Sequence, residues 1–67
     1  MNWDQIAGNW KELKGKVRAK WGKLTDHDLT IVGGKKDQLA GILQQKYGYA
    51  KEQAEKELDA FTSSLKS

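Results

Sequence analysis

The sequence predicts an all-α fold, a small bundle of about four helices built from an internal repeat. Three observations support this prediction. One pattern of glycines and apolar residues occurs twice, in residues 8–22 and 34–48. Apolar residues recur at steps of three and four, the period of an amphipathic helix. The chain of 67 residues contains no proline, so no position forbids a helix on that ground.

The repeat relates two segments that lie twenty-six positions apart. Five identical residues recur: Gly8, Leu13, Gly15, Lys20 and Gly22 return as Gly34, Leu39, Gly41, Lys46 and Gly48. Val17 returns as Leu43 and Trp21 as Tyr47, which keeps size and character. Such a repeat indicates two copies of one helical unit, each too small to bury its own apolar face.

The first helix is predicted over residues 3–21. Its apolar residues fall on one narrow stripe: Trp3, Ile6, Trp10, Leu13, Val17, Trp21 and Leu24. Asn2 is a suitable N-cap, and Asp4 suits the positive end of the helix dipole. Gly22 stands where a left-handed residue would close the helix. Gly8 and Gly15 fall on the opposite face, which predicts either a solvated back face or a close approach by another backbone.

A short second helix is predicted over 26–31, followed by a break at Gly33-Gly34. Thr25 and Asp28 form an acidic variant of the capping box. This helix pairs with 3–21 in the first of two helix pairs that pack on each other.

The second pair is predicted over 35–47 and 50–64, within one domain covering 1–67. Gly48 closes the first of these helices, and the last residues, 62–67, are expected to fray. The expected buried positions are Leu39, Ile42, Leu43 and Tyr47, followed by Ala50, Ala54, Leu58, Phe61 and Leu65.

Composition excludes several classes of protein. The chain has no cysteine and one histidine, so it offers neither a disulfide framework nor a Cys-based zinc site. The first ten residues do not form a secretory signal, and no apolar run approaches the length of a membrane helix. These observations predict a cytoplasmic protein. Marginal stability is expected, since the chain is short, weakly hydrophobic and 31% charged, and a monomer is expected.

Basic residues give the strongest charge signal. Positions 11–23 contain six of them against one acid: Lys11, Lys14, Lys16, Arg18, Lys20 and Lys23. They flank the apolar stripe on both sides, so they are candidates for contacting nucleic-acid phosphates or other anions. Trp10 and Trp21 would then stack on single-stranded bases. The alternatives are lysines that lie over the tryptophans of a solvated helix, and a helix that lies on a membrane surface.

No pattern predicts catalysis, a metal site or a cofactor. His27 lies between Asp26 and Asp28, but these acids are explained as first-turn residues of a short helix. No second histidine or nucleophile accompanies them, and the glycines do not form a phosphate-binding loop.

The chain resembles the CsbD-like family over nearly its whole length, from Asn9 to about Phe61. The resemblance rests on W-G-K-L-T-D at residues 21–26, on Asp28-Leu-Thr-Ile31, and on Y-G-Y at residues 47–49. It implies a small bacterial cytoplasmic stress-response protein of unestablished activity, with a bundle of two crossed α-hairpins. It carries over no site residues.

The predicted function is therefore a non-enzymatic protectant or macromolecular interaction protein. The alternative is a weak nucleic-acid-binding protein that uses the basic face of helix 3–21. The partner is open and includes protein clients and nucleic acid.

Overall fold

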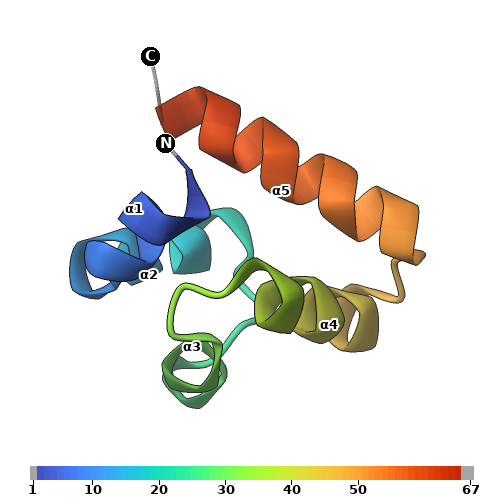
Figure 1. Ribbon diagram of the computed structural model, residues 1–67. Coiled ribbons are helices and arrows are strands. Elements are labelled where there is room, and N and C mark those ends of the chain that lie inside the picture. Colours follow the sequence, from blue (N-terminus) through green and yellow to red (C-terminus); the bar gives the residue numbers. More distant parts are fainter. Residues whose placement is uncertain (1, 66–67) are drawn as a thin grey trace.

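The computed structural model describes residues 2–65, and these contain helices and no strands. The helices are α1 (Trp3–Gly8), α2 (Trp10–Lys20), α3 (Asp26–Val32), α4 (Lys36–Tyr47) and α5 (Lys51–Leu65). Figure 1 shows α1 and α2 together at the left, α3 below them and α5 running diagonally above α4. The all-α class is confirmed, with five helices among the described residues instead of about four.

The additional helix arises from a break at Asn9. Asn9 has φ −110° and ψ 21°, and its backbone N–H donates to the carbonyl oxygens of Gln5 and Ile6 at 3.0 and 3.2 Å. Its side chain also donates to the Gln5 carbonyl at 3.1 Å. Asparagine side chains compete for backbone groups in this way and end helices. The prediction of one continuous helix over 3–21 was wrong, because a one-residue break leaves the apolar spacing unchanged.

Both predicted capping sites at helix N-termini are confirmed. The Asn2 side chain accepts from the Gln5 backbone N–H at 2.8 Å, and the Gln5 side chain accepts from the Asn2 backbone N–H at 3.1 Å. Thr25 and Asp28 exchange two bonds of 3.1 Å in the same arrangement. The starts of α1 and α3 are therefore fixed by local side-chain hydrogen bonds.

The glycines at the helix C-termini are used unequally. Gly33 and Gly48 close α3 and α4 in the left-handed conformation, with φ of 56° and 70°. Gly22 does not adopt a positive φ, and α2 ends at Trp21 with φ −119°. The prediction for Gly22 was wrong, since glycine permits the left-handed conformation without requiring it.

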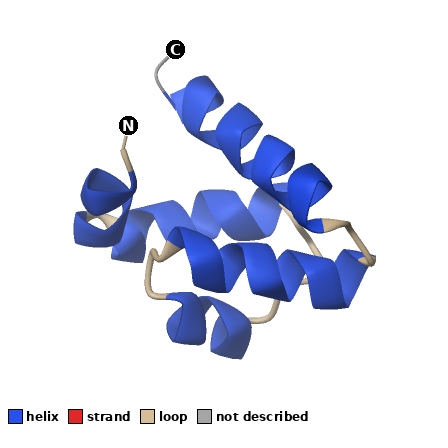
Figure 2. Ribbon diagram, turned by 45° about the vertical axis from the view of Figure 1, so that its right-hand side comes forward, coloured by secondary structure: helices blue, strands red, loops and turns tan. Residues whose placement is uncertain are grey.

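The structure shows how the repeat is built. A short helix precedes a long helix twice, as α1–α2 and as α3–α4, and the two long helices begin twenty-six residues apart. α3 contacts α4, and α4 contacts α5 most extensively. Figure 2 shows α3 and α4 side by side. α3 thus belongs with α4, whereas the sequence paired it with the helix before it. Two crossed hairpins stay a prediction.

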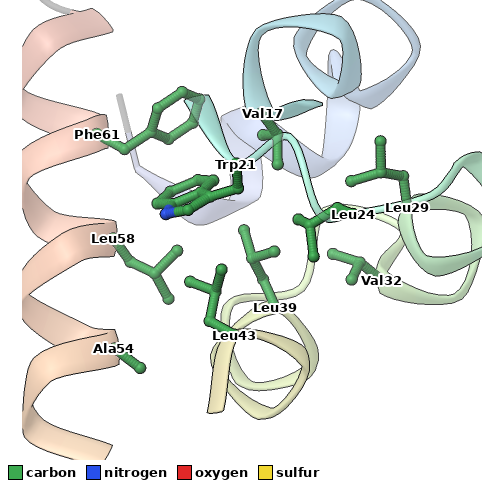
Figure 3. Packing of buried hydrophobic residues seen from close by; sticks show 10 residues of the cluster. All are labelled: Val17, Trp21, Leu24, Leu29, Val32, Leu39, Leu43, Ala54, Leu58 and Phe61. Carbon is green, nitrogen blue, oxygen red and sulfur yellow. The ribbon is translucent and has the colours of Figure 1, made fainter. Parts of the chain in front are cut away.

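The core lies where α2, α3, α4 and α5 meet. Its buried members are Val17, Trp21, Leu24, Leu29, Val32, Leu39, Leu43, Ala54, Leu58 and Phe61. Figure 3 shows these side chains converging, with Trp21 beside Phe61. Trp3, Trp10, Ile42 and Tyr47 are only partly buried, and Ala50 is exposed, contrary to the prediction for it.

α5 remains helical through Leu65, so the part of the predicted fraying that falls on 62–65 is not seen. Residues 66–67 lie outside the described part of the chain. Among residues 2–65, no helix combines the length and the apolar character that crossing a membrane requires.

Candidate interaction surface

The six predicted basic residues lie on α2 and on the turn that follows it. Five are exposed and Lys14 is half-buried. Lys11, Lys14 and Arg18 follow one flank of α2, and Lys16 and Lys20 follow the other, continued by Lys23. Between the flanks lie the exposed Gly15 and Ala19. The arrangement is therefore two basic rows separated by a strip of small residues.

Three of these cations make specific contacts within the molecule. The Arg18 guanidinium donates to the Asp26 carboxylate at the start of α3. The Lys20 ammonium lies 5.5 Å from the ring centre of Trp21, and the Lys23 ammonium lies 5.0 Å from that of Tyr47. Because these contacts are exposed to solvent, each contributes little to stability. They leave Lys11 and Lys16 as the cations most open to a partner.

The two tryptophans proposed for base stacking have structural roles. Trp21 is 2% exposed, and its ring packs at 5.4 Å and 54° against Phe61. The Trp10 indole N–H donates to the Leu29 carbonyl at 2.8 Å, which ties α2 to α3. Stacking of Trp21 on a nucleic-acid base is excluded by its burial, which corrects the prediction for Trp21. Trp10 is partly buried, and stacking by its ring stays a prediction.

The acids around His27 are structural as well. Asp26 holds Arg18, and the side chain of Asp28 accepts from the Thr25 backbone N–H and lies 3.3 Å from the Lys46 ammonium. The Thr25 N–H bond, aided by Lys46 and opposed by partial burial, lowers the pKa of Asp28 below its ordinary 3.8. Within residues 2–65, no group of three His, Cys, Asp or Glu side chains could hold a metal ion.

Three helical glycines and the turn residue Gly22 leave open surface. A Cβ built on Gly8, Gly15, Gly22 or Gly41 would meet no atom within 4 Å. Within the chain, therefore, no other segment approaches the back face of α1 and α2 at Gly8 and Gly15.

Gly34 is the exception among the repeated glycines. It is buried, its φ is 85°, and a Cβ there would lie 2.5 Å from the Cα of Ala7. The turn before α4 therefore touches the backbone of α1 directly. Only glycine combines this conformation with this close approach.

An open groove lies between α3 and α4, with a volume of about 300 Å³. Its apolar wall includes Ile31, which is 54% exposed, and the half-buried Ile42. It is lined by Asp28, Ile31, Asp37, Gln38, Gly41, Ile42 and Gln45. No sequence pattern had predicted this groove. The available signal was the pair Ile31-Val32, since adjacent helical side chains point about 100° apart, and here Val32 is fully buried while Ile31 points outward.

A second hollow of about 480 Å³ lies between α1 and the start of α4. It is lined by Trp3, Asp4, Ala7 and residues 34–38. Its lining mixes one aromatic ring with both acids and lysines, so it has no single chemical character.

Comparison with known proteins places the sequence in one family. The model of the CsbD-like family matches residues 4–56. The UPF0337 protein YjbJ of Escherichia coli strain K12 is 62% identical over 58 residues, which cover 87% of this chain and 84% of that protein. The UPF0337 protein pc0632 of Protochlamydia amoebophila is 61% identical over 61 residues, 91% of this chain and 92% of its own.

Proposed function

Because the chain belongs to the CsbD-like family, we propose that it is a small cytoplasmic stress-response protein without enzymatic activity. It protects or binds other macromolecules. Family membership supports the stress-response part of this proposal. The nature of the surface supports the mode of action.

The observation that supports protection is the separation of apolar and charged side chains. Among the described residues, Ile31 alone of the large hydrophobic side chains is highly exposed, and no polar or charged residue is buried. The surface is therefore a dense layer of charges with a net excess of three positive ones. The net charge of such a surface opposes aggregation, and its exposed lysines contact acidic clients.

A client aggregation assay tests this proposal. A purified acidic enzyme that aggregates on heating would be followed by light scattering, with the protein in molar excess. We expect the scattering to fall, and to fall less with the double variant Lys11→Ala/Lys16→Ala. The matched control is Lys51→Ala/Lys56→Ala, which removes two exposed lysines from α5. Unchanged aggregation in the presence of the wild-type protein would contradict the proposal.

Weak nucleic-acid binding through α2 is the second candidate. It is supported by the two basic rows, Lys11, Lys14, Lys16, Arg18, Lys20 and Lys23, since cations that neutralise phosphates release counterions. Because Trp21 is buried, the affinity would rest mainly on charge and fall steeply with salt. Amide shifts of the labelled protein on addition of a DNA duplex, or of its single strand, would show this. Shifts in residues 11–23 that persist at physiological salt would favour this candidate over protection.

The proposal includes one cooperative domain, 1–67, with the helices arranged as two crossed hairpins. Urea unfolding followed by tryptophan fluorescence and by circular dichroism would test the single domain. Because a single core unfolds cooperatively, coincident transitions are expected. Two separate transitions would contradict it.

A further inference from the structure

The two copies of the repeat present equivalent surfaces of opposite character. On α2, an exposed strip follows a four-residue spacing through Lys11, Gly15 and Ala19. Twenty-six residues later, the same positions of α4 are Asp37, Gly41 and Gln45. The lysine of the first copy is thus replaced by an aspartate in the second. Each stands four residues before the equivalent glycine.

The α4 strip forms the floor of the α3–α4 groove. Gly41 contributes no side chain there, and nothing lies within 4 Å of where its Cβ would be. Ile31 is 54% exposed along the groove. This is the one place on the described surface where a large aliphatic side chain lies mostly in water, so covering it is favourable.

The α2 strip has the complementary charge. Gly15 and Ala19 make it flat, because neither carries a side chain beyond Cβ. The strip is bordered by the exposed cations Lys11 and Lys16, with Glu12 as the one acid beside it. In Figure 1, α2 lies at the left of the molecule and the α3–α4 pair lies along its lower edge, so one copy can use both surfaces.

We propose that the α2 strip of one copy docks into the α3–α4 groove of a second copy, head to tail. Gly15 lies against Gly41, so that the two helix backbones approach closely. Lys11 pairs with Asp37, and the aliphatic stem of Lys16 covers Ile31. Asp28 at the groove rim is already held by Lys46 at 3.3 Å, which leaves Asp37 as the acid that attracts the partner.

A docked pair retains one unused groove and one unused strip. Such a contact does not close on itself as a two-fold dimer does, so it extends into short chains. The contact surface is small and its charges are exposed, so the association is weak, reversible and sensitive to salt. It goes beyond the proposed protective role but uses two of the same lysines, Lys11 and Lys16, so self-association and client binding compete for them. It changes the expected monomer into a protein that associates at high concentration.

Sedimentation velocity tests the proposal directly. The wild-type protein would be measured from about 0.05 to about 2 mM, in about 20 mM and about 300 mM salt. We expect the average sedimentation coefficient to rise with concentration at low salt, with a dissociation constant about tenfold higher at high salt. A coefficient that does not rise over this range at low salt overturns the proposal.

Charge-reversal variants identify the surfaces. Lys11→Glu and Asp37→Lys should each lose the association alone, and an equimolar mixture should regain it, because each variant keeps the surface that fits the other. Lys51→Glu on α5 is the matched control and should associate like the wild type. Association by Asp37→Lys alone at wild-type strength overturns the proposal, as does a mixture that stays monomeric.

A fourth variant tests the apolar half of the contact. Ile31→Ser should weaken association about fivefold at both salt concentrations, since it removes apolar area and no charge. Its amide spectrum would verify that the fold is intact. In the wild type, line broadening with concentration should be confined to residues 11–19 and 28–45, and broadening centred on α5 would overturn the proposal.

Discussion

The two long helices of the repeat differ in what covers them. α4 lies between α3 and α5, and its Leu39 and Leu43 are completely buried. α2 is covered by α1 and the core on one face, and its Leu13 remains 6% exposed. The same pattern of leucine and glycine therefore produces a central helix in one copy and a peripheral helix in the other. In this fold α4 supplies the centre of the core, and α2 has one face in the core and the other in solvent.

The aromatic residues at the ends of the two long helices show the opposite order of burial. Trp21 at the end of α2 is buried against Phe61 of α5, whereas Tyr47 at the end of α4 is half-buried. The Tyr47 hydroxyl accepts from the Lys23 backbone N–H at 3.2 Å, and its ring stacks on Tyr49 at 5.3 Å. The peripheral helix is thus anchored mainly by its last apolar residue.

The largest expected effect comes from this anchor. Trp21→Ala should lower the free energy of unfolding by about 3–5 kcal/mol, because it leaves a cavity beside Phe61. Tyr47→Ala, at the equivalent position, should cost less than half as much because that ring is partly solvated already. Urea unfolding at low temperature would measure both. Equal losses would show that the two positions contribute equally to stability, which would contradict the proposed difference between the two helix ends.

The repeated glycines should differ next. Gly34→Ala should lower the free energy of unfolding by about 2–4 kcal/mol, because its φ is 85° and its Cβ would lie 2.5 Å from Ala7. Gly8→Ala is the matched control, with no neighbour within 4 Å, and should be neutral or slightly stabilising. Thermal unfolding of the two variants decides this point. A tolerated Gly34→Ala would mean that α1 does not pack on this turn.

The central glycines of the long helices should behave alike. Gly15→Ala and Gly41→Ala should each raise the free energy of unfolding by about 1 kcal/mol, because alanine favours helix and neither site has a neighbour within 4 Å. Both variants should also weaken self-association, since both thicken the proposed contact. Opposite stability effects in the two copies would show that one glycine contacts a neighbour in the folded protein.

The smallest effect is a difference in pH dependence between the two short helices. The α1 cap uses the neutral pair Asn2 and Gln5, whereas the α3 cap uses Asp28, whose pKa is lowered below 3.8 chiefly by the Thr25 N–H. A lowered pKa adds stability above the unfolded value of about 3.8, and this stability is lost as the pH falls through the folded value. Between about pH 5 and pH 2, the Thr25 amide signal should move more than that of Asn2, whose N–H donates to the neutral side chain of Gln5.

The outcome for Asp28→Asn follows from the same linkage. This variant should lose the part of the acid sensitivity that belongs to α3 while keeping the rest. An unchanged Thr25 amide signal throughout acid titration of the wild type would contradict the assigned cap.

Periodicity predicted the fold class and most of the core, and local residue types predicted the Asn2 cap and the Thr25–Asp28 capping box. Apolar spacing and cap residues are both local properties. It missed the break at Asn9, since a one-residue interruption preserves the spacing. It also treated Gly22 and Gly48 alike, although only Gly48 adopts a positive φ. The conformation of each glycine depends on the tertiary contacts around the end of its helix, and the sequence does not show those contacts.

The candidate surface was predicted only in part. Exposure of the basic residues followed from the helical wheel, and all but the half-buried Lys14 are exposed. The contact of Arg18 with Asp26 joins α2 to α3, and that of Lys23 with Tyr47 joins the turn after α2 to α4, so no local pattern contains them. The α3–α4 groove depends on how α3 packs on α4, and this packing buries Val32 and leaves Ile31 exposed to solvent.

Native-state hydrogen exchange measured amide by amide tests the division between the two copies most directly. The account predicts that amides of α4, including those of Leu39 and Leu43, exchange only through global unfolding. Amides of α2 around Leu13 should exchange through a smaller opening, with an exchange free energy below that of α4. Equal protection of α2 and α4, or greater protection of α2, would contradict a central second copy and a peripheral first one.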